Sequence, residues 1–189
     1  MLRIAIIIGS TRPGRKGEAV AKWAYEIAQR RRDGEFELVD IKDFNLPLLD
    51  EPMPPIMGQY THDHTKTWSA KIASFDAYVF VTPEYNHATS GALKNAIDFL
   101  YVEWVNKVAG FIGYGGVSGA RAVENLRLIM GELTNPLGAD ARNNTTTYTY
   151  DNMDRLATRK DALLAIESYQ YDGNGNRTQF TDRRNKVTT

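Results

Sequence analysis

Short apolar runs and amphipathic helical patterns alternate along the first 134 residues of this 189-residue chain. The first run, Leu2–Ile8, is continuous and rich in β-branched residues, which is typical of a strand buried on both faces of a parallel sheet. Further strands are expected at 36–41, 76–81 and 108–112, each of the four followed by a helix. Strict alternation predicts an α/β fold with a doubly wound parallel sheet and right-handed crossovers.

The composition changes after Thr134. Asn135-Pro136-Leu137-Gly138 breaks any preceding helix, and the residues beyond it are rich in Thr and Asn and poorer in apolar side chains. We therefore expect two domains, an α/β domain at 1–134 and a second segment at 135–189.

Charge and cysteine content exclude several classes of protein. The 23 Lys and Arg balance the 23 Asp and Glu, whereas proteins that neutralise a nucleic-acid backbone carry a basic excess. The absence of Cys removes disulfide frameworks, thiolate metal sites and cysteine nucleophiles. The run Leu2–Ile8 is too short to span a membrane. The expectation is a cytoplasmic protein with neither a nucleic-acid nor a membrane partner.

The loop after the first strand, Gly9–Gly17, suits a phosphate group. It opens a helix, so free backbone N–H groups and the helix dipole favour an anion there. Hydroxyls and cations are added by Ser10, Thr11, Arg12, Arg15 and Lys16. The loop lacks the Gly-Lys-Ser/Thr of nucleoside triphosphatases, and Thr11 replaces the second glycine of the dinucleotide fingerprint. A single terminal phosphate fits; the alternative is a solvated basic turn.

Two further loops could hold a flat ring. After the third strand, Pro83 fixes one dihedral angle, Tyr85 offers a planar face and Asn86 offers a donor and an acceptor, although an ordinary surface turn is an equal alternative. After the fourth strand, the glycine-rich loop Gly113–Gly119 lets a ligand lie against backbone. In such sheets ligands bind at the carboxyl ends of the strands. A phosphate site beside a ring site describes a mononucleotide such as FMN.

Three motifs carry a family resemblance. Gly9-Ser10-Thr11-Arg12, Pro83-Glu84-Tyr85-Asn86 and Gly91–Asp98 resemble the NAD(P)H-dependent FMN reductase family, with its flavodoxin-like fold, over residues 1–133. The resemblance implies that the first loop holds the phosphate, the second the isoalloxazine, and Tyr114–Ser118 closes over it. The predicted cofactor-binding residues are Ser10, Thr11, Arg12, Arg15, Lys16, Gly17, Pro83, Glu84, Tyr85, Asn86, Tyr114, Gly115, Gly116 and Ser118.

The resemblance also implies an activity. Such enzymes resemble ping-pong flavoproteins, in which NADPH or NADH reduces FMN and the flavin then reduces a quinone, a free flavin or a similar small acceptor. Hydride transfer is the cofactor's own chemistry, so no catalytic acid or base is demanded. We therefore predict no catalytic side chain and no metal site, and a homodimer or tetramer by resemblance.

The tail departs from this family, whose sheet continues the order 2-1-3-4 with a fifth strand. Tyr148-Thr149-Tyr150-Asp151 and Tyr169-Gln170-Tyr171-Asp172, with a hairpin signal at Gly173–Asn176, make residues 143–189 resemble YD (rearrangement-hotspot) repeats. This raises an alternative function, a chimeric or truncated non-catalytic fragment.

A rival interpretation restores the fifth strand. Thr145–Tyr150 alternates like a strand that could pair beside the fourth, and Asp151 could cap a last helix. The apolar positions of that helix would be Met153, Leu156, Ala157, Leu163 and Leu164.

Overall fold

The computed structural model of the chain describes residues 1–134, 147–151, 153, 155–160, 166–182 and 186–188. The chain divides into two compact units, Met1–Thr134 (unit 1) and Asn135–Thr189 (unit 2), and each is described by itself. No helix in the described ranges combines the length and apolar character needed to cross a bilayer.

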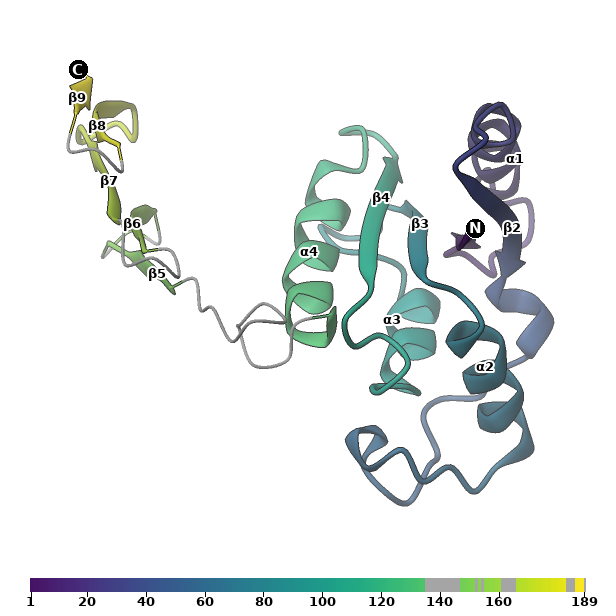
Figure 1. Ribbon diagram of the computed structural model, residues 1–189. Helices are drawn as coiled ribbons and strands as arrows, with labels where there is room; N and C mark the ends of the chain where they lie inside the picture. Colours follow the sequence, from purple (N-terminus) through teal and green to yellow (C-terminus); the bar gives the residue numbers. More distant parts are fainter. Residues whose placement is uncertain (135–146, 152, 154, 161–165, 183–185, 189) are drawn as a thin grey trace. The chain divides into compact units, whose positions relative to one another are not determined.

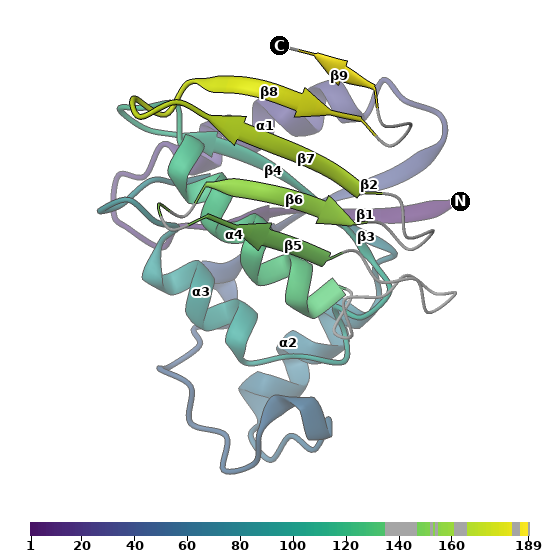
Figure 2. The same ribbon diagram turned by 90° about the vertical axis from the view of Figure 1, so that its left-hand side faces the viewer.

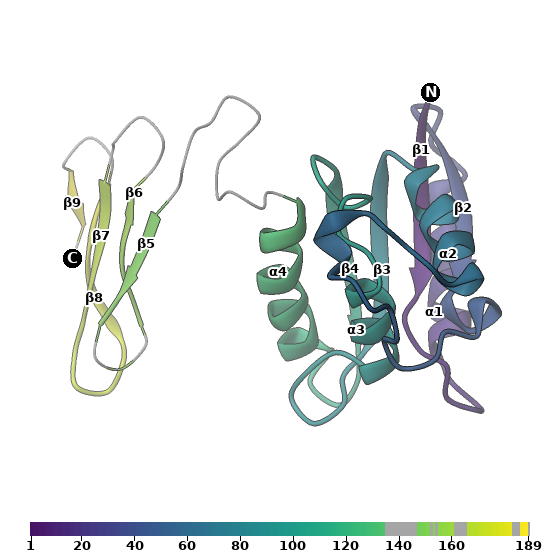
Figure 3. The ribbon, with the colours of Figure 1, turned by 90° about the horizontal axis from the view of Figure 1, so that it is seen from below.

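Unit 1 contains a four-stranded parallel sheet with the order β2-β1-β3-β4 (Figures 1 and 3). The strands are β1 (Leu2–Ile8), β2 (Gly34–Asp40), β3 (Ala77–Pro83) and β4 (Val108–Tyr114). The α-helices are α1 (Gly17–Ala28), α2 (Asp63–Ala73), α3 (Gly91–Asp98) and α4 (Ala120–Thr134), and the short 3-10 helices are η1 (Ile41–Phe44) and η2 (Pro55–Met57). The predicted α/β class and the order 2-1-3-4 are confirmed.

Helices cover both faces of this sheet. Consecutive residues of β1 point to opposite faces, which is why its apolar run is continuous. On one face α2, α3 and α4 pack with Ile7, Phe80 and the fully buried Trp104. On the other face, in the described part of the chain, α1 alone packs over Ile6 and Val81.

The apolar pattern of helix α1 is confirmed only in part: Ala24 is buried and Val20 and Ala28 pack against the core, whereas Trp23 and Ile27 do not. The pattern Val20, Trp23, Ala24, Ile27 and Ala28 places Trp23 and Ile27 toward the sheet, but these side chains are 57% and 45% exposed. The buried residues of α1 are Gly17, Ala21 and Ala24. Small residues at this spacing bring the helix backbone close to the sheet, and the large side chains are turned outward.

Unit 2 is an antiparallel meander in which the five strands pair in sequence order (Figure 2). The strands are β5 (Thr147–Tyr150), β6 (Leu156–Lys160), β7 (Ile166–Tyr171), β8 (Arg177–Thr181) and β9 (Val187–Thr188). The hairpin between β7 and β8 turns at Gly173–Asn176, as the sequence predicts.

The rival interpretation, a fifth parallel strand followed by a last helix, is wrong. Strand β5 pairs with β6 rather than with β4, and Leu156 and Ala157 lie in β6 instead of a helix. Asp151 does not cap a helix; its Oδ1 accepts the backbone N–H groups of Met153 at 2.9 Å and Arg155 at 3.0 Å. This local closure reverses the chain into a hairpin. Of the remaining positions, Thr145, Leu163 and Leu164 lie outside the described residues.

Candidate functional site

The site begins where β1 ends, because Gly9 brings this loop against β3 and α3. Its N–H donates to the carbonyl of Val81 at 2.8 Å, and its own carbonyl accepts the Ser90 hydroxyl at 2.5 Å. A Cβ added to Gly9 would lie 2.6 Å from Leu93 Cδ2, so a side chain would clash here. Only glycine lets the loop leave the sheet at this depth.

The next residues prepare a site for an anion at the start of α1. Ser10 is buried, with its hydroxyl 3.4 Å from that of Tyr85. Lys16 occupies the N-cap position of α1 without a side-chain cap, which leaves the first backbone N–H groups of the helix open to an outside acceptor. Within residues 1–134, Arg12 and Lys16 form no ion pair with a carboxylate. Two cations therefore remain available at this helix terminus.

Arg15, in contrast, is already paired with a carboxylate. Its guanidinium pairs with the Asp40 carboxylate at the end of β2, Nη1 donating to Oδ1 at 3.0 Å and Nη2 to Oδ2, and it also donates to the Ser10 carbonyl. The Arg15 side chain is only 9% exposed. It ties the loop after β1 to the end of β2, and much of its charge is neutralised by Asp40.

The loop after β3 makes a tight turn. Tyr85 and Ala88 exchange two backbone hydrogen bonds, at 3.0 and 3.1 Å, around Asn86 and His87. Asn86 has φ 49° and His87 has φ 72°, and left-handed backbone at both central residues is the geometry of a type I′ turn. The turn presents Tyr85, which is 38% exposed, at the edge of the sheet.

The loop after β4 forms the opposite wall. An added Cβ on Gly17 would lie 2.5 Å from the Tyr114 hydroxyl, so the phenol packs on the start of α1. Burial raises the pKa of Tyr114, as does nearby Tyr85. Gly115 has φ 152° and Ser118 has φ 57°, so this loop bends sharply before α4. Beside Gly116 the space is open, with nothing within 4 Å of an added Cβ.

The three loops converge on one hollow of about 140 Å³. Its lining residues are Arg12, Arg15, Lys16, Pro83, Glu84, Tyr85, Tyr114 and Gly115. All of them belong to the set that the sequence predicts. Positions more than 100 residues apart in the chain therefore line a single site at the carboxyl ends of the strands, where ligands bind in such folds.

The comparison with known families agrees with this geometry. Residues 2–139 match the model of the family described as NADPH-dependent FMN reductase. The chain belongs to this family. The match ends at residue 139, so it gives no support to the resemblance of the tail to YD repeats, nor to the alternative of a chimeric non-catalytic fragment.

Curated relatives of this FMN reductase family protein carry matching descriptions. An NAD(P)H-dependent FMN reductase of a Nectria species is 45% identical over 140 residues, which are 69% of this chain and 70% of the relative. One of Schizosaccharomyces pombe is 42% identical over 133 residues, which are 69% of this chain and 66% of the relative. The chain thus spans about two thirds of the length of these relatives.

Solved structures share the flavodoxin-like fold of this family protein. The flavoenzyme NAD(P)H:(acceptor) oxidoreductase FerB of Paracoccus denitrificans superposes with a TM-score of 0.58 at 25% identity, over 71% of this chain and 74% of that one. The apo form of an NADH:FMN oxidoreductase superposes with a TM-score of 0.55 at 20% identity, over 70% of each chain.

The residues at the hollow fit the two ends of FMN. Free cations, hydroxyls and an uncapped helix start match a phosphate, and an exposed phenol beside the open backbone at Gly116 matches one edge of a flat ring. The hollow is smaller than the 300–1,000 Å³ usual for a ligand of drug size. It would therefore enclose part of the nucleotide and leave the rest over open surface.

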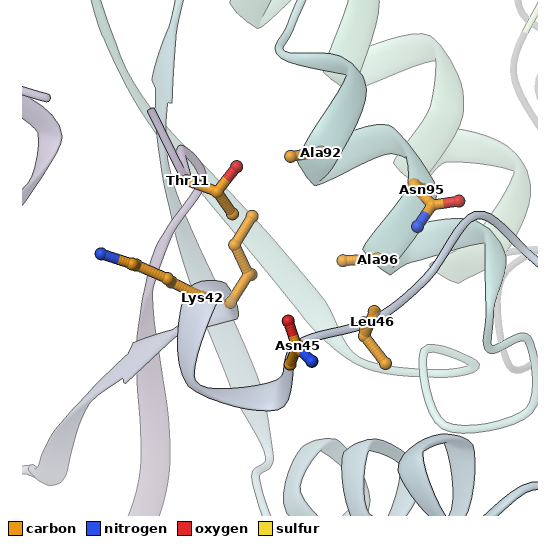
Figure 4. Close-up of a pocket in the computed structure, with 8 residues that line it drawn as sticks. Thr11, Lys42, Asn45, Leu46, Ala92, Asn95 and Ala96 are labelled. Carbon is orange, nitrogen blue, oxygen red and sulfur yellow. The ribbon is translucent and has the colours of Figure 1, made fainter. Parts of the chain in front are cut away.

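Six predicted residues do not line this hollow: Ser10, Thr11, Gly17, Asn86, Gly116 and Ser118. Thr11 faces a second hollow of about 290 Å³ between η1 and α3, opposite Ala92 and Ala96 (Figure 4). The others lie in the same three loops. Ser10 is buried within the loop after β1.

Sequence reasoning missed Asp40 and Arg121. Asp40 holds Arg15, and Arg121 holds Glu84 in an ion pair whose Nε–Oε1 distance is 2.6 Å. A signal existed for each. Asp40 stands at the carboxyl end of a predicted strand, the edge where the loops meet, and Arg121 places a cation in the first turn of a helix, where the dipole disfavours it.

Proposed function

We propose that this chain is an NAD(P)H-dependent FMN oxidoreductase. It takes a hydride from NADPH or NADH through bound FMN and passes it to a small acceptor such as a quinone or a flavin. The observation that carries this proposal is the convergence of three loops, all predicted from the sequence as cofactor-binding, on one hollow. Membership of the FMN reductase family supports the same activity.

In this proposal the loop after β1 binds the phosphate of FMN. Arg12 and Lys16 supply the charge, Ser10, Thr11 and the backbone at Gly17 supply hydrogen-bond donors, and the dipole of α1 adds to the attraction. The role of Arg15 differs from the phosphate contact that the sequence predicts. Since its guanidinium pairs with Asp40, it holds the loop in place more than it neutralises the phosphate.

The other two loops hold the flavin ring. We assign one wall to Pro83, Glu84, Tyr85 and Asn86 and the other to Tyr114, Gly115, Gly116 and Ser118. When bound, FMN supplies the hydride chemistry itself. The protein's contribution is to fix the ring between the two walls and to leave one part of it open for the nicotinamide and then for the acceptor. No side-chain acid or base is assigned to catalysis.

The class of acceptor follows from the open, shallow site. A 140 Å³ hollow that leaves the ring partly uncovered suits small planar molecules that stack. The names of two relatives fit this class of acceptor. An NAD(P)H:quinone oxidoreductase of Solanum tuberosum is 33% identical to this chain, and a 2-hydroxy-1,4-benzoquinone reductase of a Burkholderia species is 32% identical. We further propose a cytoplasmic location, a homodimer or tetramer, and residues 1–134 as the cofactor-binding domain.

An assay of the full chain tests the function. NADPH and NADH oxidation is followed with a benzoquinone acceptor, with and without added FMN. Oxidation of NADPH or NADH is expected to require FMN. When both substrates are varied, double-reciprocal plots of the initial rate should give parallel lines, the signature of a ping-pong sequence. Oxidation that is equal with and without protein would contradict it.

A further inference from the structure

Glu84 carries a charge and is buried, although the proposed cofactor chemistry does not require a buried charge at this position. Its side chain lines the site, yet it is only 4% exposed. The carboxylate accepts hydrogen bonds from Arg121, from Nε at 2.6 Å and from the backbone N–H at 3.2 Å, and it also pairs with Nη2. Buried carboxylates that are paired and hydrogen-bonded in this way are expensive to leave without their partner.

The pair spans the two proposed ring walls. The Glu84 N–H donates to the Tyr114 carbonyl at 3.0 Å, and a Cβ added to Gly115 would lie 3.2 Å from Glu84 Cβ. The backbones of the two loops are therefore in contact at Glu84. Arg121, in the first turn of α4, binds the same residue from the far end of the glycine-rich loop. The ion pair closes a loop of chain that runs from Tyr114 to Arg121.

Arg121 by itself does not stabilise helix α4. A cation in a first helical turn opposes the helix dipole, whereas a carboxylate there is favourable. Glu84 supplies that carboxylate from the neighbouring loop. Burial raises its pKa, but the Arg121 side chain and the backbone N–H groups of Arg121 and Ala122 outweigh this and lower the pKa. The ion pair of Glu84 and Arg121 therefore connects α4 to the loop after β3.

Arg121 also reaches the strained part of that loop. Its Nη1 lies 3.5 Å from Nδ1 of His87, whose φ of 72° is uncommon for a residue other than glycine. Residues in such conformations persist where the surroundings fix them. Arg121 contacts both Glu84 and His87, which flank Tyr85 and Asn86.

We infer that Arg121 is a positioning residue for the flavin site. Through Glu84 it sets the spacing between the Tyr85 wall and the Tyr114–Gly115 wall, and through His87 it supports the tight turn. The inference rests on the proposed function, because the spacing matters for catalysis only if a flavin ring binds there.

Arg121→Ala in the full chain tests the inference by fluorescence titration with FMN. The dissociation constant is expected to rise at least about tenfold, since the unpaired Glu84 carboxylate draws water or moves and the walls separate. Arg127→Ala is the matched control, because Arg127 is an exposed arginine of the same helix, and it should leave the constant unchanged. The double variant Glu84→Gln/Arg121→Gln should recover most of the affinity, because no buried charge is left unpaired.

Amide hydrogen exchange without FMN separates this inference from the proposed function. In Arg121→Ala, exchange at the amides of Tyr85 and Ala88 should accelerate, while the amides of β1 keep their protection and show that the protein is folded. Acceleration limited to this turn shows that Arg121 holds the loop, and a wild type that nevertheless fails to bind FMN would count against the proposed function instead. Equal exchange in Arg121→Ala and Arg127→Ala would overturn the positioning role, as would equal FMN affinity in a wild type that binds FMN.

Discussion

Unit 1 and unit 2 remove very different amounts of side-chain surface from water. In unit 1, Trp68, Phe80 and Trp104 are at most 1% exposed and lie in one continuous core. In unit 2, every residue between 151 and 188 whose side chain the structure describes is half-buried or exposed. Among the described residues of unit 2, the rings of Tyr169 and Phe180 lie on neighbouring strands of the sheet with their centroids 5.2 Å apart.

Unit 2 instead repeats one local hydrogen-bonding device. The N–H groups of Asp151, Asp172 and Asp182 each donate to the carbonyl of the residue four positions on, all at 2.9 Å. The Oδ1 atom of each of these residues accepts the N–H of that same later residue. Asp151 and Asp172 end the two Tyr-x-Tyr-Asp segments, so each of these segments leads into a hairpin turn. Unit 1 is thus held by apolar packing between distant elements, and unit 2 by hydrogen bonds between neighbouring strands and within their turns.

The largest effect is expected from Trp104→Ala. The indole is fully buried, packs on Tyr78 at 4.8 Å and donates from Nε1 to the Ile97 carbonyl at 3.2 Å. Its removal should lower the free energy of unfolding of unit 1 by about 3–5 kcal/mol. Because all three Trp lie in unit 1, the fluorescence of the remaining two in urea reports on this unit. A loss below about 1 kcal/mol would contradict the statement that buried apolar packing holds unit 1 together.

Unit 2 should respond most to its turn residues. In Asp172→Ala the N–H groups of Asn174 and Asn176 lose their 2.9 Å acceptor, at an expected cost of about 1–2 kcal/mol in the β7–β8 hairpin. Amide exchange in β7 and β8 measures this, and Asp172→Asn, which keeps an acceptor oxygen, is the control. The tryptophan transition of unit 1 should not move; a shift there would mean that the units are energetically coupled.

Glu51 should make the stability of unit 1 depend on pH. Burial would raise the pKa of Glu51, but hydrogen bonds led by the backbone N–H of Thr61 lower it to about 2. A carboxylate with a lowered pKa stabilises the fold fully above its unfolded value near 4.5, and the contribution is lost as the pH falls through 2. The difference in urea midpoint between the wild type and Glu51→Gln should therefore be present at pH 6 and shrink toward pH 2. A difference that grows on acidification would contradict the assignment.

The smallest effect is expected from Trp23→Ala. Although Trp23 belongs to the same unit as Trp104, it is 57% exposed on the outer side of α1. Surface substitutions of this kind change stability by about 0.5 kcal/mol or less. The urea transition of unit 1, followed by the fluorescence of the other two tryptophans, should stay in place. A cost comparable to that of Trp104→Ala would show that this side of α1 is covered.

The sequence predicted what depends on local pattern. The run Leu2–Ile8 indicated a doubly buried strand, and the glycine loops indicated the edge that holds the site, because periodicity and turn chemistry act over a few residues. Asp40 and Arg121 were missed because their partners, Arg15 and Glu84, stand 25 and 37 residues away. No local rule connects positions so far apart.

Two departures from the sequence patterns had physical causes of their own. In α1, the large residues Trp23 and Ile27 dominate any hydrophobic pattern, but the sheet accepts the small residues Gly17, Ala21 and Ala24. In the tail, spacing that suits a helix after Asp151 was overridden by its carboxylate, which closes a turn with Arg155. In α1 a close backbone approach decided the structure, and in the tail a hydrogen bond from the backbone to a side chain did.

The FMN site proposed at the loops of unit 1 is tested most directly by titrating the full chain with FMN and following flavin fluorescence. The wild type should bind, and Arg12→Ala should weaken binding about tenfold or more, because a charge-assisted contact to the phosphate is lost. Arg32→Ala removes another exposed positive charge, beyond the far end of α1, and should bind like the wild type. A wild type that does not bind FMN, or equal affinities of the two variants, would contradict the account.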